Sequence, residues 1–392
     1  MHRRRVIRPF GAPAIRPFAW LVPIALAAVS GASPAGVLPE DRADVLYHSY
    51  DGGGVTIDGP SILVRKQFAG KFSASANYYI DKVSSASIDV VTTASPYDEE
   101  RTQYSLGLDY LRDRWMLNLG FSSSKENDFD AETFSIGISQ DLFGDLTTIS
   151  LGYSLGDDIV TRRGDADFSD TIKRQHYRLG ISQILTQNLL LGFSYETITD
   201  EGFLNNPYRS VRYLDDSSPA GYSYEPEIYP RTRTSDAGAL RLRYYLPYRA
   251  ALHWEYRSYT DTWDIASDTF EMGYTHPLND AITLEAKVRG YSQERAEFYS
   301  DLFAYEQFAN FIARDKELSS FDSTTFRLGV SYRILPGGWR FIERGSVNLV
   351  WDHIFFDYKD FRDLRQPGLT PGTEPLYEFD ADVVQIFVSF WL

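Results

Sequence analysis

Charged residues recur at every second position in several stretches of the chain. The segment LRLRY carries Arg241 and Arg243, and LHWEYR carries Glu255 and Arg257. Side chains at i and i+2 point to the same side of a β-strand, so these acids and bases would form rows on one face. Such rows can clamp a plug or, in an open channel, set ion selectivity. The charged candidates in this pattern are Arg178, Glu196, Arg241, Arg243, Glu255, Arg257, Glu271, Glu285, Arg289 and Arg327.

A second set of polar and aromatic side chains lies in the longest irregular stretch, residues 199–236. Aromatic, amide and guanidinium groups together can stack on and hydrogen-bond a sugar or another polar ligand. The alternative, which we favour, is that Arg209 and Arg212 pair with Asp215 and Asp216 and hold the loop in place. The ligand candidates are Phe203, Asn205, Asn206, Tyr208, Arg209 and Arg212.

An acidic stretch, GDDIVTRRGDADFSD, is a weak candidate for calcium. Carboxylate oxygens at alternating positions suit Ca²⁺, but the stretch lacks the glycine and the final glutamate of an EF-hand loop. A solvated acidic loop is therefore the favoured interpretation, and we predict no metal or other cofactor. The carboxylates concerned are Asp157, Asp158, Asp165, Asp167 and Asp170.

Catalytic chemistry has less support. No histidine lies in a motif that identifies a serine nucleophile, and the absence of cysteine excludes a thiolate nucleophile and a Cys-ligated metal. The glycine-rich YDGGGVTIDGP lacks the Lys-Ser/Thr of a phosphate-binding loop. We predict no enzyme; a barrel enzyme acting on lipid or an envelope substrate is kept as an alternative. Its candidate bases are His48, His176, His253, His276 and His353.

The elements that must position these groups are β-strands. YSLGLDY, ITLEAKVRG and FRLGVSY alternate apolar with polar residues, which is the period of a strand and not of a helix. Several alternating runs are roughly nine residues or longer, the length that a tilted membrane crossing needs. The chain is therefore predicted to be all-β.

The connections between these strands alternate in length. Short turns such as LRDR, LTQN and LPYR are separated by long polar loops. This alternation predicts a transmembrane antiparallel up-and-down β-barrel with short periplasmic turns and long extracellular loops. Counting from ADVLYHSY gives about 16 strands, with 14 as the alternative. The expected loops are residues 82–100, 125–130, 156–172, 199–236, 261–267, 292–321 and 357–377.

The two ends of the sequence indicate export to the bacterial outer membrane. Residues 1–32 combine a basic start, a short apolar run and the small residues SGA, as in a cleaved signal peptide. Residues 33–42 would be a linker and residues 43–392 the barrel. The final strand, VVQIFVSFWL, resembles the signal read by barrel-insertion machinery, so that machinery and membrane lipid are expected partners. Its apolar ladder is Val384, Ile386, Val388, Phe390 and Leu392.

The net charge of -15 argues against nucleic acid as a partner, because phosphates require a basic face. The composition is also rich in aromatic residues, at 15%, as in barrels with an apolar exterior.

Blocks spread from about residue 40 to the end resemble an uncharacterised bacterial family of predicted outer-membrane proteins, known only as a domain of unknown function. The resemblance implies a barrel fold and an exported location, and it supplies no catalytic residues. The resemblance further implies a gene neighbourhood with flavin-transfer and thioredoxin-like proteins, and with it a redox-linked partner. The blocks include YDGGGVTIDGPSILVRK, ISQDLFGDLTTISLGY, DEGFLNNPYRSVRYLD, RYYLPYRAALHWEYR and FDADVVQIFVSFWL.

These observations lead to one functional expectation with two alternatives. We expect a pore or a scaffold within an envelope complex. The alternatives are a barrel enzyme and a plugged barrel that holds a periplasmic or lipoprotein partner.

Overall fold

The computed structural model describes residues 36–85, 97–366 and 368–392. The expected signal peptide, residues 1–32, lies outside the described residues, as does most of the expected loop 82–100. No helix in the described part of the chain is long and apolar enough to span a membrane.

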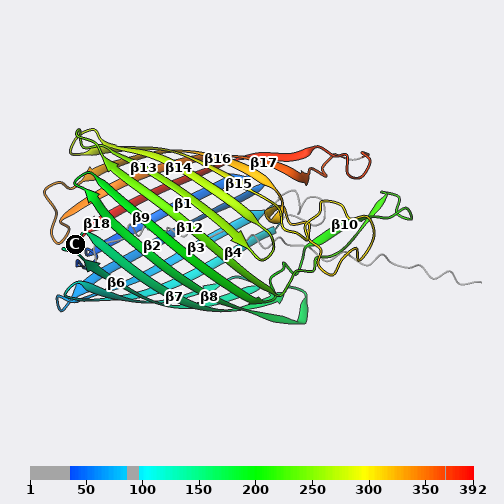
Figure 1. Cartoon of the computed structure of the whole chain (residues 1–392), viewed down its shortest axis with the longest axis horizontal. Helices are drawn as coiled ribbons and strands as arrows, with labels where there is room; N and C mark the ends of the chain where they lie inside the picture. The colour runs from blue at the N-terminus through cyan, green and yellow to red at the C-terminus, as the bar shows by residue number, and fades with distance from the viewer. Residues whose placement is uncertain (1–35, 86–96, 367) are drawn as a thin grey trace, which may run out of the picture.

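Within the described residues, 16 antiparallel strands close into one barrel (Figure 1), which confirms the predicted fold and strand number. Two further strands pair with each other outside the barrel. The barrel strands are β1 (Arg42–Gly52), β2 (Val55–Phe68), β3 (Phe72–Ser85), β4 (Tyr97–Arg112), β5 (Trp115–Lys125), β6 (Phe129–Leu142), β7 (Thr147–Arg162), β8 (Asp165–Thr186), β9 (Leu189–Gly202), β12 (Thr232–Tyr245), β13 (Ala251–Asp261), β14 (Ala266–Pro277), β15 (Ile282–Gln293), β16 (Phe321–Ile334), β17 (Arg344–Arg362) and β18 (Leu376–Trp391). The separate hairpin consists of β10 (Ser210–Leu214) and β11 (Tyr222–Pro226).

The barrel closes where β1 pairs with β18. Arg42 lies opposite Trp391, which in turn lies opposite Arg344 on β17. The guanidinium carbons of Arg42 and Arg344 lie 5.8 and 4.6 Å from the Trp391 ring centroid. Cation–π contacts therefore hold the ends of three strands together at this seam.

The outer face of the barrel is apolar. Met272, Val288 and Phe326 lie side by side on β14, β15 and β16, and they are 48%, 37% and 49% exposed. Val384 and Ile386 of the terminal ladder are likewise 36% and 46% exposed. Large apolar side chains in these numbers are stable against lipid and not against water. The chain is therefore an outer-membrane β-barrel, as predicted from the sequence.

The two ends of the barrel differ. At one end β4 and β5 are joined through residues 113–114, and β8 and β9 through residues 187–188. At the other end the long connections, with the β10–β11 hairpin, gather beyond the strands (Figure 1). The short turns mark the periplasmic end and the long loops the extracellular end.

One expected loop is instead mostly strand. β7 and β8 continue through residues 156–172, with a turn only at residues 163–164. Polar composition indicated a loop, but strands that rise above the membrane meet water on both faces and can be polar throughout. The acidic residues of this stretch therefore lie on an extended hairpin.

Three long connections fold into one body, which we call the cap: residues 203–231, residues 294–320 and the described residues of 363–375. Backbone hydrogen bonds join the first two segments, from Phe303 N to Arg212 O (2.8 Å) and from Ile312 N to Ile228 O (2.9 Å). Gly202 ends β9 with φ 135°, and a Cβ there would lie 1.9 Å from Thr171 O. Only glycine fits where the chain leaves the barrel for the cap.

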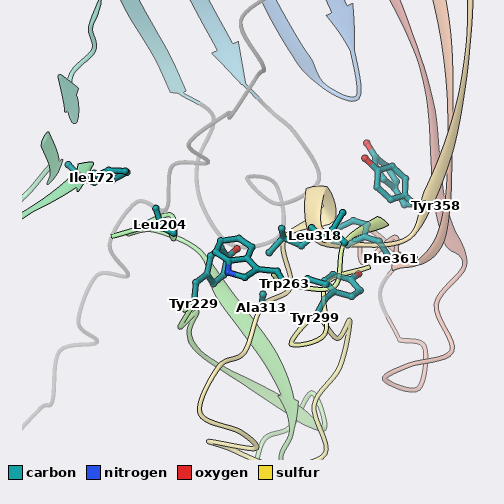
Figure 2. Packing of buried hydrophobic residues seen from close by; sticks show 13 residues of the cluster. Ile172, Leu204, Tyr229, Trp263, Tyr299, Ala313, Leu318, Tyr358 and Phe361 are labelled. Carbon is teal, nitrogen blue, oxygen red and sulfur yellow. The ribbon is translucent and has the colours of Figure 1, made fainter. Parts of the chain in front are cut away.

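A hydrophobic core attaches the cap to the barrel. Trp263, 4% exposed, packs edge-on against Tyr229 at 5.6 Å and against Phe298 at 5.2 Å between ring centroids. Figure 2 shows Trp263 beside the cap residues Tyr229 and Ala313, and Phe361 of β17 beside Leu318 of the cap. The core members are Val160, Ile172, Leu204, Tyr229, Trp263, Ile265, Ala296, Tyr299, Ala313, Leu318, Tyr358, Phe361 and Tyr377.

Candidate functional site

The inner face of the barrel is identified by the aromatic side chains that meet the cap. Phe356 and Phe379 lie opposite each other on β17 and β18, and both pack against the cap core. Asp352, four residues from Phe356, shares this face because side chains alternate along a strand. Arg327 lies opposite Asp352, so it also points into the lumen.

The sheet register extends this inner face across the strands. Arg241, Glu255, Glu271 and Arg289 form one row through β12, β13, β14 and β15. Directly paired residues share a face of the sheet. The same pairing and the two-residue period place all ten charged candidates on the lumen side, as follows: Arg178, Glu196, Arg241, Arg243, Glu255, Arg257, Glu271, Glu285, Arg289 and Arg327.

We define the charged wall as the inner face of β8, β9 and β12 to β17. Among the ion pairs of its described residues, four join one of the ten candidates to a carboxylate or to an arginine or lysine. The four pairs are Arg241 Nε to Glu255 Oε2 at 2.7 Å, Arg257 Nη2 to Glu196 Oε1 at 2.8 Å, Lys287 Nζ to Glu271 Oε2 at 3.0 Å, and Arg327 Nε to Asp352 Oδ1 at 2.6 Å. Lys287 and Asp352 are not among the ten candidates. Lys287 could have been found, since it lies two residues from Glu285.

The charged wall is not fully neutralised. Within the described residues, Arg178, Arg243 and Arg289 form no ion pair with a carboxylate, and neither does Glu285 with a base. The Arg241 side chain is 50% exposed even though it is paired. Groups this exposed face water, so the lumen beneath the cap has room for solvent.

The opposite wall contains a row of small, uncharged residues. Ser75, Gly107, Gly120 and Ser135 form one row across β3, β4, β5 and β6. A Cβ on Gly107 would lie 2.6 Å from Ser75 Oγ, and one on Gly120 would lie 2.5 Å from Ser135 Oγ. The serine side chains therefore lie over the glycines and line this wall with hydroxyl groups. Sequence reasoning did not single out this wall.

The cap is held by a buried charge network centred on Arg212. This side chain is 0% exposed; its Nη1 lies 2.5 Å from Glu374 Oε1 and its Nη2 lies 2.9 Å from Asp301 Oδ2. Arg314 shares Asp301, at 2.9 Å. The Arg212 guanidinium also lies over the Tyr222 ring, 5.2 Å from its centroid. We call Arg212, Asp301 and Glu374 the latch, because they join all three cap segments.

The expected acid partners of the loop arginines were wrong. Arg212 pairs with carboxylates of two other loops, and Arg209 pairs with Asp315. Asp215 instead accepts hydrogen bonds from Ser217 Oγ and Ser223 Oγ, both at 2.6 Å, because the β10–β11 turn folds back on it.

The remaining loop candidates also serve the cap. Tyr208 donates from its hydroxyl to Asp128 Oδ2 at 2.6 Å, which ties the cap to the β5–β6 turn. Asn206 accepts from the Tyr208 backbone at 2.9 Å, and Asn205 donates to the Glu227 carbonyl at 3.3 Å. Asn206, Tyr208, Arg209 and Arg212 are buried, so they do not form an open ligand-binding surface.

Two cap carboxyl groups titrate differently. Burial, together with the nearby Asp315 carboxylate, raises the pKa of Glu227 to about 7. Burial alone would also raise the pKa of Glu374, but hydrogen bonding to the Arg212 guanidinium holds that pKa below its ordinary value. The cap thus contains one acid that favours the neutral form and one that favours the charged form.

The carboxylates of the β7–β8 hairpin do not lie together at one site. Asp157 and Asp158 are consecutive in β7 and point to opposite faces. Asp170 pairs with Arg231 at 2.8 Å, and Asp165 pairs with Arg162. Asp167 is exposed. Across the described residues, no group of three or more histidine and acidic side chains is placed to hold a metal ion.

Two lumen histidines lie in ion-pair surroundings. His176 Nε2 lies 3.0 Å from Glu196 Oε2, and His253 Nε2 lies 3.1 Å from Thr275 Oγ1. Arg243 donates to His253 Nδ1 at 3.2 Å, so a neutral His253 must carry its proton on Nε2 and cannot accept one from Thr275. This geometry does not activate a nucleophile.

The other three histidines have acidic or phenolic partners. His48 Nε2 lies 2.7 Å from Asp81 Oδ1 on the lumen wall, and the His48 ring stacks on Tyr79. His276 meets the Tyr274 hydroxyl at 2.8 Å, and His353 meets Asp382 at 2.9 Å. None of the hydrogen bonds found among the described residues joins a histidine to a serine.

Comparison with known proteins identifies a family for this chain. The family model described as "Protein of unknown function (DUF3570)" matches residues 21–178 and 169–344. No curated protein matches the chain.

The solved structures that align with this chain are other barrels. The siderophore receptor PirA from Acinetobacter baumannii aligns with 12% identity and a TM-score of 0.43, covering 90% of this chain and 60% of the receptor. The chain thus spans little more than half of that protein. A bacterial polysaccharide outer membrane secretin aligns with 8% identity and a TM-score of 0.47, covering 91% and 100%. A FadL homologue from Pseudomonas aeruginosa aligns with 10% identity and a TM-score of 0.44, covering 91% and 92%.

Proposed function

Because the chain belongs to the DUF3570 family, to which no activity is assigned, we propose from its geometry that it is an outer-membrane channel for polar solutes. The family confirms the resemblance seen in the sequence. In this proposal the charged wall lines the path of the solute. The cap closes the extracellular end, and opening requires the cap to move.

The observation that carries this proposal is the contrast in exposure between lumen and cap. Arg241 and Glu255 of the charged wall are 50% and 27% exposed, although they lie inside a closed barrel. Arg212 in the cap is 0% exposed. A barrel built only as a solid scaffold would fill its lumen with packed side chains. It would then have few charges there, since a buried charge is costly. Exposed charges below a packed cap fit a water-filled path with a closed outer end.

Conductance of the full chain in a planar bilayer tests the proposal. We expect rare openings for the native protein and frequent openings for Arg212→Ala, because this change removes the cation that joins the three cap segments. Arg241→Ala is the matched control, since it removes a paired arginine from the wall and leaves the cap intact. If the Arg212→Ala protein inserts, shows the heat-dependent gel shift of a folded barrel and stays silent, the channel proposal is wrong.

A scaffold remains the second candidate because the cap has exposed aromatic side chains. Tyr305 and Phe308 are 57% and 47% exposed, and their ring centroids lie 5.1 Å apart. Such a pair suits a protein contact. A partner that co-purifies with the native chain and is lost from Tyr305→Ser/Phe308→Ser, together with silent bilayers, would support the scaffold instead.

We also infer that the barrel is not a hydrolase. The lumen histidines His176 and His253 are engaged by Glu196 and Arg243 and do not activate a hydroxyl group. Esterase or lipase activity in the native protein that disappears in His253→Ala would contradict this inference.

A further inference from the structure

We propose that the lumen of this barrel is an anion pathway, in which Arg178, Arg243 and Arg289 provide successive sites for small anions such as chloride and inorganic phosphate. This inference rests on the channel function proposed above and names its class of solute. The three arginines share one property that the other arginines among the ten lumen candidates lack. Each is on the charged wall without a carboxylate partner among the described residues.

Arg178 is left unpaired because the acid opposite it is already engaged. It faces Glu196 on β9, but Glu196 binds Arg257 at 2.8 Å and His176 at 3.0 Å. On its other side Arg178 faces Gly152, where a Cβ would lie only 3.8 Å from Arg178 Nε. The guanidinium is exposed and borders the small-residue part of the sheet. Its positive charge therefore acts on the lumen solvent.

Arg289 repeats this arrangement on β15. It faces Glu271 on β14, but Glu271 binds Lys287 at 3.0 Å. The contact found for the Arg289 guanidinium is the ring of Tyr291, 5.8 Å from its centroid. An aromatic ring orients a guanidinium without neutralising its charge.

Arg243 has a neutral neighbour instead of an acid. It faces His253 on β13 and donates to His253 Nδ1 at 3.2 Å. A histidine that accepts this hydrogen bond is uncharged. The positive charge of Arg243 is therefore not cancelled by its partner.

The three arginines are spread along the wall and do not form one pocket. Arg178 lies in the row of Glu196, Arg289 in the row of Glu271 and Arg243 in the row of His253. Conduction requires sites that are weak and repeated, so that an ion can both enter and leave. Three separated guanidinium groups meet this requirement better than one tight cluster would.

On the charged wall itself the acids do not cancel this excess. On the charged wall Glu285 is the one unpaired acid among the ten candidates, against three arginines. The opposite wall carries the carboxylates of Asp109 and Asp141, which are hydrogen-bonded by neutral groups: by Asn118 at 2.6 Å, and by Thr148 at 2.6 Å and the Gly36 backbone at 2.9 Å. An anion would therefore be drawn along the charged wall, in a chain whose total charge is -15.

Two readouts on the full chain test the pathway. The first is the reversal potential across a bilayer with a KCl gradient, measured with the cap opened by Glu374→Gln. We expect chloride to be more permeant than potassium, and we expect this preference to vanish in Arg178→Gln/Arg243→Gln/Arg289→Gln. The second is broadening of the phosphorus NMR line of inorganic phosphate by detergent-solubilised protein. We expect the same triple variant to abolish it.

A charge-neutral pair supplies the matched control. Arg249→Gln/Asp280→Asn removes an exposed ion pair (3.1 Å) between two short periplasmic turns and leaves the charged wall intact, so both readouts should keep their native values. Replacement of the three arginines by lysine should also keep the chloride preference. Conductance without anion preference, or a preference that survives the triple variant, overturns the anion pathway while the channel stands. Silent bilayers with phosphate broadening that depends on the three arginines overturn the channel while the anion sites stand.

Discussion

The cap and the charged wall contain the same ion pair in two different settings. Arg212 binds Glu374 in the cap at 2.5 Å, and Arg241 binds Glu255 on the wall at 2.7 Å. The first arginine side chain is 0% exposed and the second is 50% exposed. Loss of one partner leaves a buried charge in the cap, whereas water compensates the loss on the wall. Equal geometry therefore predicts unequal consequences, and burial decides which pair holds structure.

The largest effect is expected for Arg212→Ala. The change leaves Asp301 and Glu374 buried with their shared cation gone, and breaking a buried pair costs about 3–5 kcal/mol. The cap should open locally while the barrel remains folded. Hydrogen exchange measures this, with faster exchange at residues 203–231 and 294–320 and unchanged exchange in the barrel strands. Protection of the cap equal to the native level would show that the latch is not essential.

Trp263→Ala tests the apolar contacts that attach the cap to the barrel. Trp263 is buried in the core that joins cap to barrel, and removal of a buried tryptophan costs about 3 kcal/mol or more. We expect the same pattern of faster exchange, somewhat weaker than for Arg212→Ala. Trp254→Ala on the lipid face is the matched control, because it removes the same side chain away from the cap. If both variants exchanged like the native protein, the aromatic core would not attach the cap.

The pH dependence of the cap should be bell-shaped. The raised pKa of Glu227, about 7 in the folded cap, gives a contribution that is present below its ordinary value of 4.5 and is lost as pH rises through about 7. The lowered pKa of Glu374 gives a contribution that is present above 4.5 and is lost as pH falls below it. Cap protection should therefore be greatest near pH 4.5, and it should decline as pH rises from about 4.5 to about 7.

Single substitutions separate the two sides of this pH profile. Glu227→Gln should remove the decline at high pH and keep the decline at low pH. Hydrogen exchange measured across the pH range checks this, and an unchanged profile in Glu227→Gln would assign the high-pH decline to another group.

The smallest effect is expected for Arg241→Gln. An exposed ion pair contributes roughly 0–1 kcal/mol, so the free energy of unfolding should change by less than about 1 kcal/mol. Urea unfolding of the detergent-solubilised protein measures it. A loss as large as that of Arg212→Ala would mean that the wall is drier than its exposure indicates, and the contrast between the two regions would fail.

The wall and the cap also differ in how far the sequence predicts them. Period-two alternation is sufficient to assign Arg241, Glu255 and Arg289 to one face, because strand geometry is local. The latch could not be found in this way, since Arg212 and Glu374 are 162 residues apart and lie in loops without a period. Asp215 and Asp216 were close in sequence and were the natural guess, but a turn directs Asp215 to its own serines. Polarity also misled at residues 156–172, where strands continue above the membrane.

The seam between β1 and β18 has a consequence for assembly. Arg42 and Trp391 meet there although nearly the whole barrel lies between them in sequence. Contacts this distant form slowly, because loop-closure entropy must be overcome before they stabilise the fold. Until they form, two strand edges have free backbone groups, each costing several kcal/mol in lipid. We therefore expect membrane insertion and ring closure to occur as one cooperative step, with no stable open sheet in the bilayer.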